Sequence, residues 1–445
     1  MTAGTQIRLP DHLSHPFSPA GRADPYPAYD WLRSRAPVHY DAMSRLWLVT
    51  GHADCAAVLR DRGFSASAGQ QGRARGEELP PSMLTTDPPD HTRLRAPGLL
   101  LLGPAAIASV AGGIAADVDD LLERLAGETV VDAVREIGSP LATSVFLRLF
   151  GLAERDRKVF AQLAQAASIN LDPLAGPQVA ALGRSAMAEL SRFLDGHCMV
   201  AAPSPLARLA ADDRLTRPEM LGVLGLAVVG GWQPLAEAIG NALYWLLPRP
   251  EALAALREGG EELARTAMDE LLRLEAPIPF TARVAAGNVT LPGGEVPQGA
   301  RVLAVVAAAN RDPAVFDRPG ELVLDRTPNP HLAFGGGPHF CLAAQLVRQT
   351  GAVLLSRLAG RFPAASLADA NPAWAATMIP RRLRALPVNL CALPADTVDL
   401  SADPGALPAD LGAVPAGSGV LGATPGALPA DSAALPADVG GGDAY

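Results

Sequence analysis

The residue best suited to chemistry is Cys341, because its neighbours match what a thiolate ligand of haem iron requires. Phe334 lies seven positions before it, a run of three glycines starts at Gly335, and His339 lies two positions before it. Glycines let backbone N–H groups approach a thiolate and donate to it, and a thiolate on haem iron favours O–O bond cleavage. The alternative is an inert buried cysteine beside a glycine turn. The phenylalanine and histidine in register disfavour that alternative.

The chain resembles the cytochromes P-450 in five separated motifs. These are the haem-binding loop at Cys341, the DPPxHxRxR stretch at 87–95, the ExxR pair at 270–273, the ANRDP segment at 309–313 and the central helix near 239–243. The resemblance covers residues 24–390. It implies a mainly α fold with a minor β region, in which haem b lies between a long central helix and the cysteine loop. It also implies that Cys341 ligates the iron, that Phe334 packs beside the porphyrin, and that Gly335 belongs to the haem site.

A buried haem needs partners for its two propionates, because uncompensated carboxylates are costly in a low dielectric. His91 and Arg95 lie four positions apart, which places them on one face of a helix. By resemblance, these two residues together with Arg283 and His339 are the propionate partners.

An acid and a base lie three positions apart at Glu270 and Arg273. Most pairs at this spacing are solvated pairs on a helix surface. The resemblance instead makes the pair structural and buried, with Arg326 as its third member. We assign these residues to folding and haem retention rather than to chemistry.

The central helix departs from the family pattern at the residues expected beside the oxygen site. Aligned through residues 239–243, the family's acid and following threonine are replaced by the last two residues of the segment Gly230, Gly231, Trp232, Gln233 and Pro234. In ordinary members that acid and alcohol organise water for proton delivery. Glutamine is not such an acid and proline has no hydroxyl, although proline leaves a helix carbonyl free and the glycines leave room. We expect these five residues to form the catalytic distal side. A tolerated kink, with protons supplied by another water chain, is the alternative.

Three reactions fit this departure. In the first, a substrate hydroxyl or carboxylate replaces the threonine in a hydroxylation or epoxidation supported by ferredoxin and ferredoxin reductase. In the second, a substrate radical couples or rearranges. In the third, peroxide supplies oxygen and electrons, but the family's peroxygenases carry arginine where this chain has Gln233. A haem isomerase or sensor without oxygenase turnover is the competing class, and the absence of a GxSxG motif leaves a hydrolase unsupported.

Substrate contacts are expected, by analogy with the family, in segments 64–84, 168–203, 229–233, 278–280 and 378–379. These segments are largely apolar or small, which favours a bulky small molecule of low polarity. A polyketide, terpenoid or peptide-derived intermediate fits, either free or bound to a carrier. Plain core packing would give the same composition.

Composition indicates the cellular setting. The 445 residues carry a formal net charge of −9 and no basic stretch suited to nucleic acid. The four cysteines are far apart with no CxxC pair, which favours a reducing cytoplasm over a disulfide framework or a zinc site. No signal peptide is visible, and no apolar run reaches the roughly 20 residues that span a bilayer. We expect a cytoplasmic monomer with no membrane or nucleic-acid partner.

Three regions are expected along the chain. Residues 1–23 form an N-terminal extension and residues 24–390 form one haem domain. Residues 391–445 repeat Ala-Leu-Pro-Ala-Asp and are expected to form a flexible tail. The expected elements are a hairpin of 38–40 with 46–49 and helices at 24–35, 54–60, 105–126, 140–166, 178–196, 217–247, 250–274 and 341–360.

Overall fold

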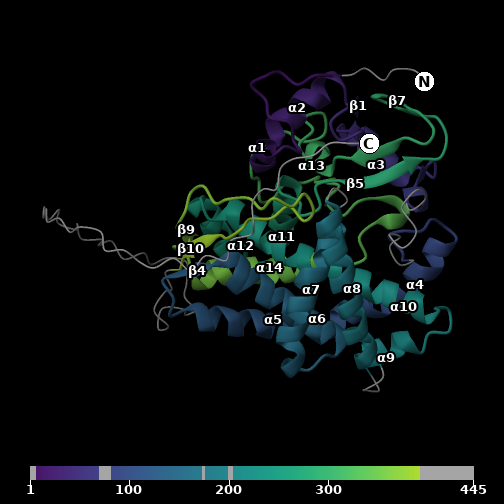
Figure 1. Ribbon diagram of the computed structural model, residues 1–445. Coiled ribbons are helices and arrows are strands. Elements are labelled where there is room, and N and C mark those ends of the chain that lie inside the picture. Colours follow the sequence, from purple (N-terminus) through teal and green to yellow (C-terminus); the bar gives the residue numbers. More distant parts are fainter. Residues whose placement is uncertain (1–6, 70–81, 173–175, 199–203, 391–445) are drawn as a thin grey trace, which may run out of the picture. The chain divides into compact units, whose positions relative to one another are not determined.

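Helices form most of the described part of the chain, and small β-sheets accompany them (Figure 1). The structure is a computed structural model that describes residues 7–69, 82–172, 176–198 and 204–390. The predicted C-terminal tail, residues 391–445, lies outside the described residues. The mainly α architecture with a minor β region agrees with the predicted fold class.

Most of the connections between the described α-helices are short. The helices are α1 Pro19–Ala23, α2 Tyr26–Arg35, α3 His52–Arg60, α4 Asp90–Leu102, α5 Pro104–Leu125, α6 Ser139–Phe150, α7 Arg157–Ala167, α8 Pro177–Cys198, α9 Pro205–Ala210, α10 Arg217–Val229, α11 Trp232–Leu246, α12 Pro250–Leu274, α13 Val306–Ala309 and α14 Ala344–Arg361. Longer segments that carry strands or loops separate α3 from α4, α12 from α13 and α13 from α14. A π-helical turn, η2 (Ala133–Gly138), precedes α6.

The strands form three sheets within the described residues, with orders β1-β2-β8-β5-β3, β4-β10-β9 and β6-β7. They are β1 Val38–Asp41, β2 Leu46–Val49, β3 Phe64–Ser65, β4 Val130–Asp132, β5 Thr281–Ala285, β6 Val289–Leu291, β7 Gly294–Val296, β8 Arg301–Ala304, β9 Ser366–Leu367 and β10 Pro387–Asn389. The antiparallel register Val38↔Val49 confirms the predicted hairpin. β2 also pairs in parallel with β8, which joins the N-terminal hairpin to a strand far along the chain.

The predicted helix over 140–166 is wrong as one element. Gly151 adopts φ 70° and ends α6 in the left-handed conformation, which glycine adopts without a steric penalty. The chain then re-enters a helix at Arg157.

The predicted helix over 217–247 is also wrong as one element, because it divides into α10 and α11 at Gly230 and Gly231. A Cβ at position 231 would lie 2.6 Å from the carbonyl oxygen of Ala227, so only glycine fits this close approach. Because α11 begins at Trp232, Pro234 falls in its first turn. N–H groups of a first turn have no intrahelical acceptor, so proline costs little there.

Two helical stretches, 90–125 and 217–246, are long and apolar enough to cross a membrane by length and composition. Each contains two of the helices described above. Core helices share this composition, and 72% of the apolar window of the second stretch and 28% of that of the first are buried. The expectation of no membrane partner therefore stays a prediction.

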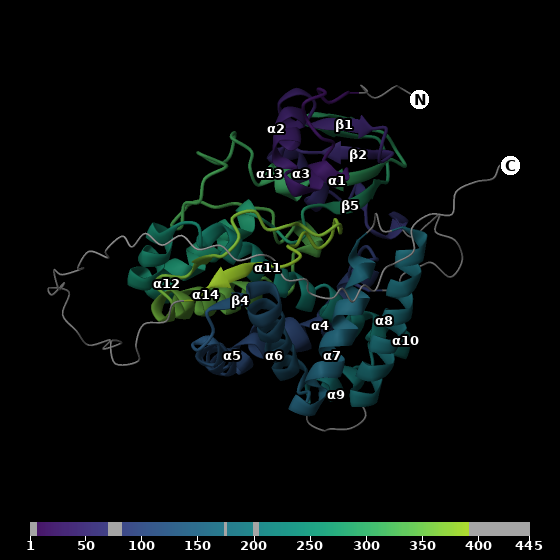
Figure 2. The same cartoon turned by 60° about the vertical axis from the view of Figure 1, so that its left-hand side comes forward.

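Helices α12 and α14 lie side by side and carry the supports of the cysteine segment (Figures 1 and 2). They approach closely because Gly351 on α14 faces Met268 on α12, where a Cβ would lie 2.5 Å from the methionine sulfur. This packing fixes the start of α14, only three residues after Cys341.

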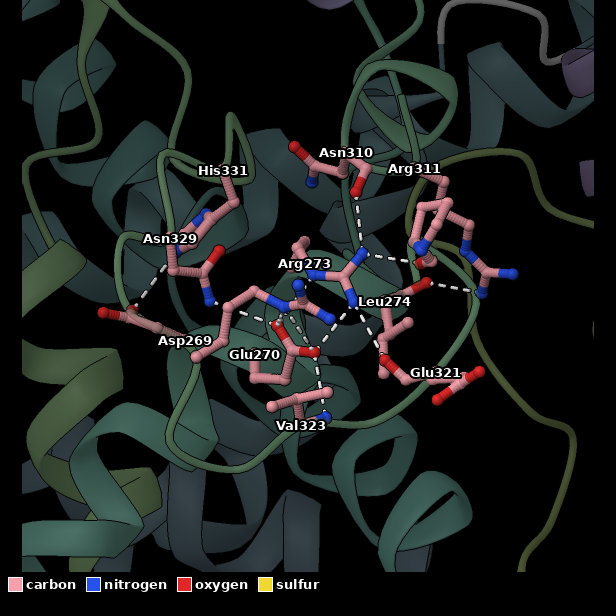
Figure 3. A network of polar contacts seen from close by, with 12 residues as sticks. Asp269, Glu270, Arg273, Leu274, Asn310, Arg311, Glu321, Val323, Asn329 and His331 are labelled. Carbon is pink, nitrogen blue, oxygen red and sulfur yellow. Dashed lines mark hydrogen bonds and ion pairs between the residues drawn. The ribbon is translucent and has the colours of Figure 1, made fainter. Parts of the chain in front are cut away.

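A buried carboxylate at the end of α12 ties the chain segments before Cys341 together (Figure 3). Glu270 is fully buried and accepts two hydrogen bonds from Arg273, at 2.7 and 2.8 Å. Arg326 Nε lies 3.0 Å from both Glu270 oxygens, which confirms the predicted third member. The Val323 N–H and the Asn329 amide donate to the same carboxylate, at 3.1 and 3.2 Å.

The neighbouring Asp269 extends these contacts to the cysteine segment (Figure 3). Its Oδ1 lies 3.2 Å from His331 Nε2 and 2.7 Å from Arg348 Nε. His331 Nδ1 in turn lies 3.2 Å from the N–H of Ala333. The segment that leads to Cys341 is therefore attached to both α12 and α14.

Replacing Glu270 by glutamine should destabilise the protein strongly, because it leaves Arg273 and Arg326 buried without a full countercharge. Breaking a buried ion pair costs about 3–5 kcal/mol. Urea unfolding of the holoprotein, followed by circular dichroism, measures the loss. The matched control is Arg265→Ala on the same helix, since Arg265 and Glu261 lie 3.8 Å apart and are largely exposed. That variant should lose less than about 0.5 kcal/mol. Equal losses in the two variants would show that Glu270 does not hold the fold.

Candidate haem-thiolate site

Cys341 is held in a tight loop at the start of α14. Its N–H donates to the carbonyl of Phe334 at 2.8 Å, which closes the loop. Gly335 and Gly337 adopt φ values of 71° and 61°, a conformation that other residues rarely adopt. A Cβ at Gly337 would also lie 2.5 Å from the carbonyl oxygen of Leu59 on α3. The glycine run therefore permits both the turn and its close packing.

Phe334 is buried beside this loop, with Arg348 on one side. The Arg348 guanidinium lies 4.7 Å from the centre of the Phe334 ring. Burial raises the pKa of the Cys341 thiol, while the N–H of Ala343 and the charges of Arg95 and Arg348 oppose the rise. Metal coordination deprotonates a thiol, and these opposing groups stabilise the resulting negative charge.

The four predicted propionate partners come from α4, β5 and the cysteine loop. The rings of His91 and His339 lie 4.4 Å apart between centroids. Arg283 is 6% exposed on β5 and donates to Thr281 Oγ1 and the carbonyl of Ala282. Arg95 donates to the carbonyl of Phe340 at 2.6 Å.

Burial and the neighbouring arginines disfavour the charged forms of the two histidines. Burial lowers the pKa of His339 to about 4, with Arg283 and His91 adding to the effect. Burial, Arg95 and Arg283 lower the pKa of His91, against the opposite effect of Asp87. Both ring nitrogens of His91 are buried without a hydrogen-bond partner among the described residues. A buried polar group without a hydrogen-bond partner costs free energy. A ligand with two carboxylates would bond to the His91 ring and would offset the charges of the arginines beside it.

The residues therefore fit haem b, on the unpartnered nitrogens of His91 and on the two arginines, Arg95 and Arg283, which act on His91 without a carboxylate of the described residues bound to them. Cys341 would hold the iron, Phe334 and Gly335 would flank it, and His91, Arg95, Arg283 and His339 would hold the propionates. When bound through a thiolate, haem supplies the activation of dioxygen or peroxide.

The five predicted distal residues lie at the break between α10 and α11. Gly230 and Gly231 form the break, and Pro234 lies in the first turn of α11. Trp232 is buried and donates from Nε1 to Thr143 Oγ1 of α6 at 3.0 Å, so the indole anchors the helix. Gln233 is 5% exposed and donates from Nε2 to Glu237 Oε1.

Glu237 is a residue that the sequence reasoning missed. It is 1% exposed, and burial raises its pKa to about 7, with Arg382 and the Gln233 hydrogen bond opposing the rise and Asp132 adding to it. Its spacing of four from Gln233 was visible in the sequence. A glutamate on a helix is usually solvated, and only the packing of distant segments shows that this one is not.

A cavity of about 270 Å³ opens beside the break in the central helix. Most of its surface is apolar. It is lined by Ser82, Leu84 and Thr85, by Asn170 and Leu171, by Met187 and Ser191 of α8, and by six residues of α10 from Pro218 to Val229. Helices α8 and α10 pack against each other at this end of the helical body (Figures 1 and 2).

The cavity contains parts of three predicted substrate segments, namely 64–84, 168–203 and 229–233. Residues 70–81, 173–175 and 199–203 of these segments lie outside the described residues. The structure does not bring the other two segments to the cavity. Phe280, Met378 and Ile379 are buried in an apolar cluster with Phe17. The first half of α10 also lines the cavity, which was not predicted from the sequence. Its apolar run is equally typical of a core helix.

Comparisons with known proteins agree with this arrangement. Residues 204–370 match the family model for Cytochrome P450. The chain is 31% identical over 379 residues to "Biotin biosynthesis cytochrome P450" of Bacillus subtilis (strain 168), covering 82% of this chain and 96% of that protein. It is 33% identical to "Cytochrome P450 monooxygenase PikC" of Streptomyces venezuelae, covering 82% and 91%.

Solved structures show the same fold. The crystal structure of CalO2 has a TM-score of 0.78 at 29% identity, covering 85% of this chain and 99% of that one. P450BioI in complex with hexadec-9Z-enoic acid ligated acyl carrier protein has a TM-score of 0.75 at 29% identity, covering 82% and 98%. The predicted fold class and the haem cofactor are confirmed by these relationships.

Replacing Cys341 by serine should abolish the thiolate-type spectrum of the carbonyl complex, because a serine oxygen does not supply the thiolate's electron density. The absorption spectrum of the reduced, carbon monoxide-bound protein measures this. The control is Cys55→Ser, since Cys55 is fully buried and its Sγ donates to the carbonyl of Val49, a bond that serine can also make. A thiolate spectrum that survives in Cys341→Ser would refute the ligand assignment.

Proposed function

The chain belongs to the cytochrome P450 family, and from that premise we propose that it is a monooxygenase that modifies a bulky, largely apolar intermediate of secondary metabolism. Cys341 ligates the iron of haem b, and ferredoxin with its reductase supplies the electrons. The modification is a hydroxylation, an epoxidation or an oxidative coupling. The haem domain of residues 24–390 acts as a cytoplasmic monomer, without a membrane or nucleic-acid partner.

The observation that carries this proposal is the apolar cavity beside the helix break. A cavity lined mainly by apolar side chains with a few polar groups is typical of sites for small molecules of low polarity. Asn170 and Ser191 are among its few polar linings, and Val229 joins it to Gly230. A substrate held there would reach the residues predicted to form the distal side.

Two relatives support a biosynthetic role. One is named "Nocardicin C N-oxygenase", from Nocardia uniformis subsp. tsuyamanensis, and is 35% identical over 382 residues. The structural neighbour P450BioI binds a fatty acid carried by an acyl carrier protein, as its description states. We infer that the substrate here is a biosynthetic intermediate, either free or attached to a carrier.

Filling the cavity should weaken substrate binding. A Cβ at Gly225 would already lie 3.0 Å from the sulfur of Met187, so Gly225→Phe places a ring in the cavity. Hexadec-9-enoic acid and a neutral macrocyclic lactone serve as probes, each titrated against the holoenzyme and followed by the haem absorption shift. At least one probe should bind at least about 10-fold more weakly to the variant, a loss of about 1.4 kcal/mol.

The matched control for this variant is Leu182→Phe on α8, because Leu182 is 67% exposed and lies outside the cavity lining. Its affinity should equal that of the wild type. Probe binding that Gly225→Phe leaves unchanged would place the substrate elsewhere.

The oxidant distinguishes a monooxygenase from the alternatives. The wild type should form product with dioxygen, ferredoxin and reductant, and the double variant Gln233→Glu/Pro234→Thr should couple electron use to product more efficiently, because it restores an acid and a hydroxyl. Mass spectrometry of single-turnover product, beside parallel reactions with hydrogen peroxide, measures this. Product that forms with peroxide but not with dioxygen, ferredoxin and reductant would refute the monooxygenase assignment. Failure of both oxidants would favour a haem protein without oxygenase activity.

A further inference from the structure

Helix α11 carries a buried file of polar residues, in which Gln233, Glu237 and Asn241 occur at every fourth position. Residues at this spacing lie on one face of a helix, about 6 Å apart along its axis. Their exposed fractions are 5%, 1% and 1%. Apart from Gly240 and Tyr244, the remaining residues of α11 are apolar. The file is therefore a polar strip inside an apolar core.

Each member of the file has one side-chain oxygen without a hydrogen-bond partner among the described residues. These atoms are Gln233 Oε1, Glu237 Oε2 and Asn241 Oδ1. Buried polar atoms in proteins are almost always satisfied, by protein groups or by ordered water. Three unpartnered oxygens along one face indicate a path for internal water.

The other polar atoms of the file hold it in place. Gln233 donates to Glu237 Oε1, and Asn241 Nδ2 donates to the carbonyls of Arg381 and Glu275, at 3.0 and 3.3 Å. The file thus has a fixed conformation in which the unpartnered oxygens remain available as acceptors.

Two charged groups from other elements face Glu237. Asp132 at the end of β4 and Arg382 before β10 act on it electrostatically, and both are partly exposed to solvent. The π-helical turn η2 packs against α11, where Gly138 meets the carbonyl of Ala236. Because its pKa is about 7, Glu237 can both hold and release a proton near neutral pH.

The file starts at the break in the central helix. Pro234 lies directly after Gln233 and has no N–H, so it donates nothing to the carbonyl of Gly230. That carbonyl and Gln233 Oε1 are acceptors for water at the end of the file that adjoins the predicted distal residues.

We propose that Glu237 is a proton-relay residue, which passes protons toward the oxygen side of the haem through water held by Gln233 and the Gly230 carbonyl. The proposal rests on the monooxygenase function. That reaction consumes one dioxygen, two electrons from ferredoxin and two protons, and it inserts one oxygen atom and releases one water. In each transfer the O–H bond of Glu237 breaks and its proton moves to water. Solvent beside Arg382 and Asp132 then returns a proton to the carboxylate.

The protonation of Glu237 can be measured in the resting holoenzyme, without turnover. Infrared spectra recorded across neutral pH should show a carboxylic-acid band in the wild type that disappears with a midpoint near pH 7 and is missing in Glu237→Gln. In Gln233→Glu the midpoint should rise, because a second carboxyl one turn away disfavours the charged form. A wild type without this band would overturn the proposal, whatever the variants do.

Turnover tests the relay itself, with hexadec-9-enoic acid as the probe. With dioxygen, ferredoxin and reductant, Glu237→Gln should form product at least about 10-fold more slowly, and with hydrogen peroxide it should retain the wild-type rate. The wild-type rate should fall as pH rises through about 7, since only the protonated carboxyl donates. The variant should lack this fall and should show a changed solvent isotope effect. The control is Glu258→Gln on α12, an exposed glutamate.

The outcomes separate the two proposals. A wild type that forms no product with dioxygen and reductant refutes the monooxygenase function. A wild type that forms product, beside a Glu237→Gln variant with the same rate, pH profile and isotope effect, overturns the relay and leaves Glu237 a structural residue.

The stability of Glu237→Gln should depend on pH differently from that of the wild type. The pKa of Glu237 is raised from 4.5 to about 7, so between these values the folded protein binds one more proton than the unfolded chain. Wild-type stability therefore falls as pH rises across this range, and Glu237→Gln should lack this contribution. Its melting temperature relative to the wild type should increase over the same range. A relative melting temperature that does not change with pH would contradict a buried, titrating Glu237.

Discussion

The arrangement of the haem site depends on the cost of burying the carboxylate of Glu270. An ion without partners in a protein interior costs several kcal/mol, so this side chain is stable only when its oxygens are fully engaged. Arg273, Arg326, the Val323 N–H and the Asn329 amide engage them. Val323 and Asn329 lie about 50 residues or more after Glu270 in the sequence. The segment that contains them leads to the cysteine loop. One carboxylate thereby sets where Cys341 can lie.

Three glutamates are buried in the described part of the chain, and they differ in their partners. Glu270 and Glu275 each face arginines. Burial alone would raise the pKa of Glu275, but Arg381 and Arg311 hold it below its ordinary value. Glu237 has only the Gln233 amide as a described hydrogen-bond donor, and burial therefore dominates its pKa. Contact with arginines thus lowers the pKa of buried Glu275, whereas burial without such a contact raises the pKa of Glu237.

Residues with a fixed local spacing were predictable from the sequence, and residues that depend on distant packing were not. The loop at Cys341 and the contact of Glu270 with Arg326 followed from motifs, and the structure brings those residues together. The break at Gly230 was not foreseen, because two glycines do not interrupt the apolar periodicity of residues 217–247. Gln233, Glu237 and Asn241 were visible as a polar stripe, yet such a stripe usually marks a solvated face. Contacts with segments remote in sequence, among them η2 and the carbonyls of Glu275 and Arg381, bury it.

The departures at Gln233 and Pro234 are linked to Glu237 by position, because Glu237 lies one turn beyond Gln233 on the same helix face. At the two positions that the resemblance places beside the oxygen, Pro234 has neither a hydroxyl nor an N–H, and Gln233 is not an acid. The next turn carries Glu237, whose carboxyl is protonated up to about pH 7. In the proposed relay, a proton from Glu237 travels about 6 Å farther along the helix axis than one from position 233. The amide of Gln233 does not relay protons as readily as a hydroxyl. Water must therefore complete the path, and the unpartnered oxygens of Gln233 and Glu237 are the acceptors that would hold it. In the proposed relay, the altered residues thus lengthen the route for protons and make its rate depend on the order of internal water.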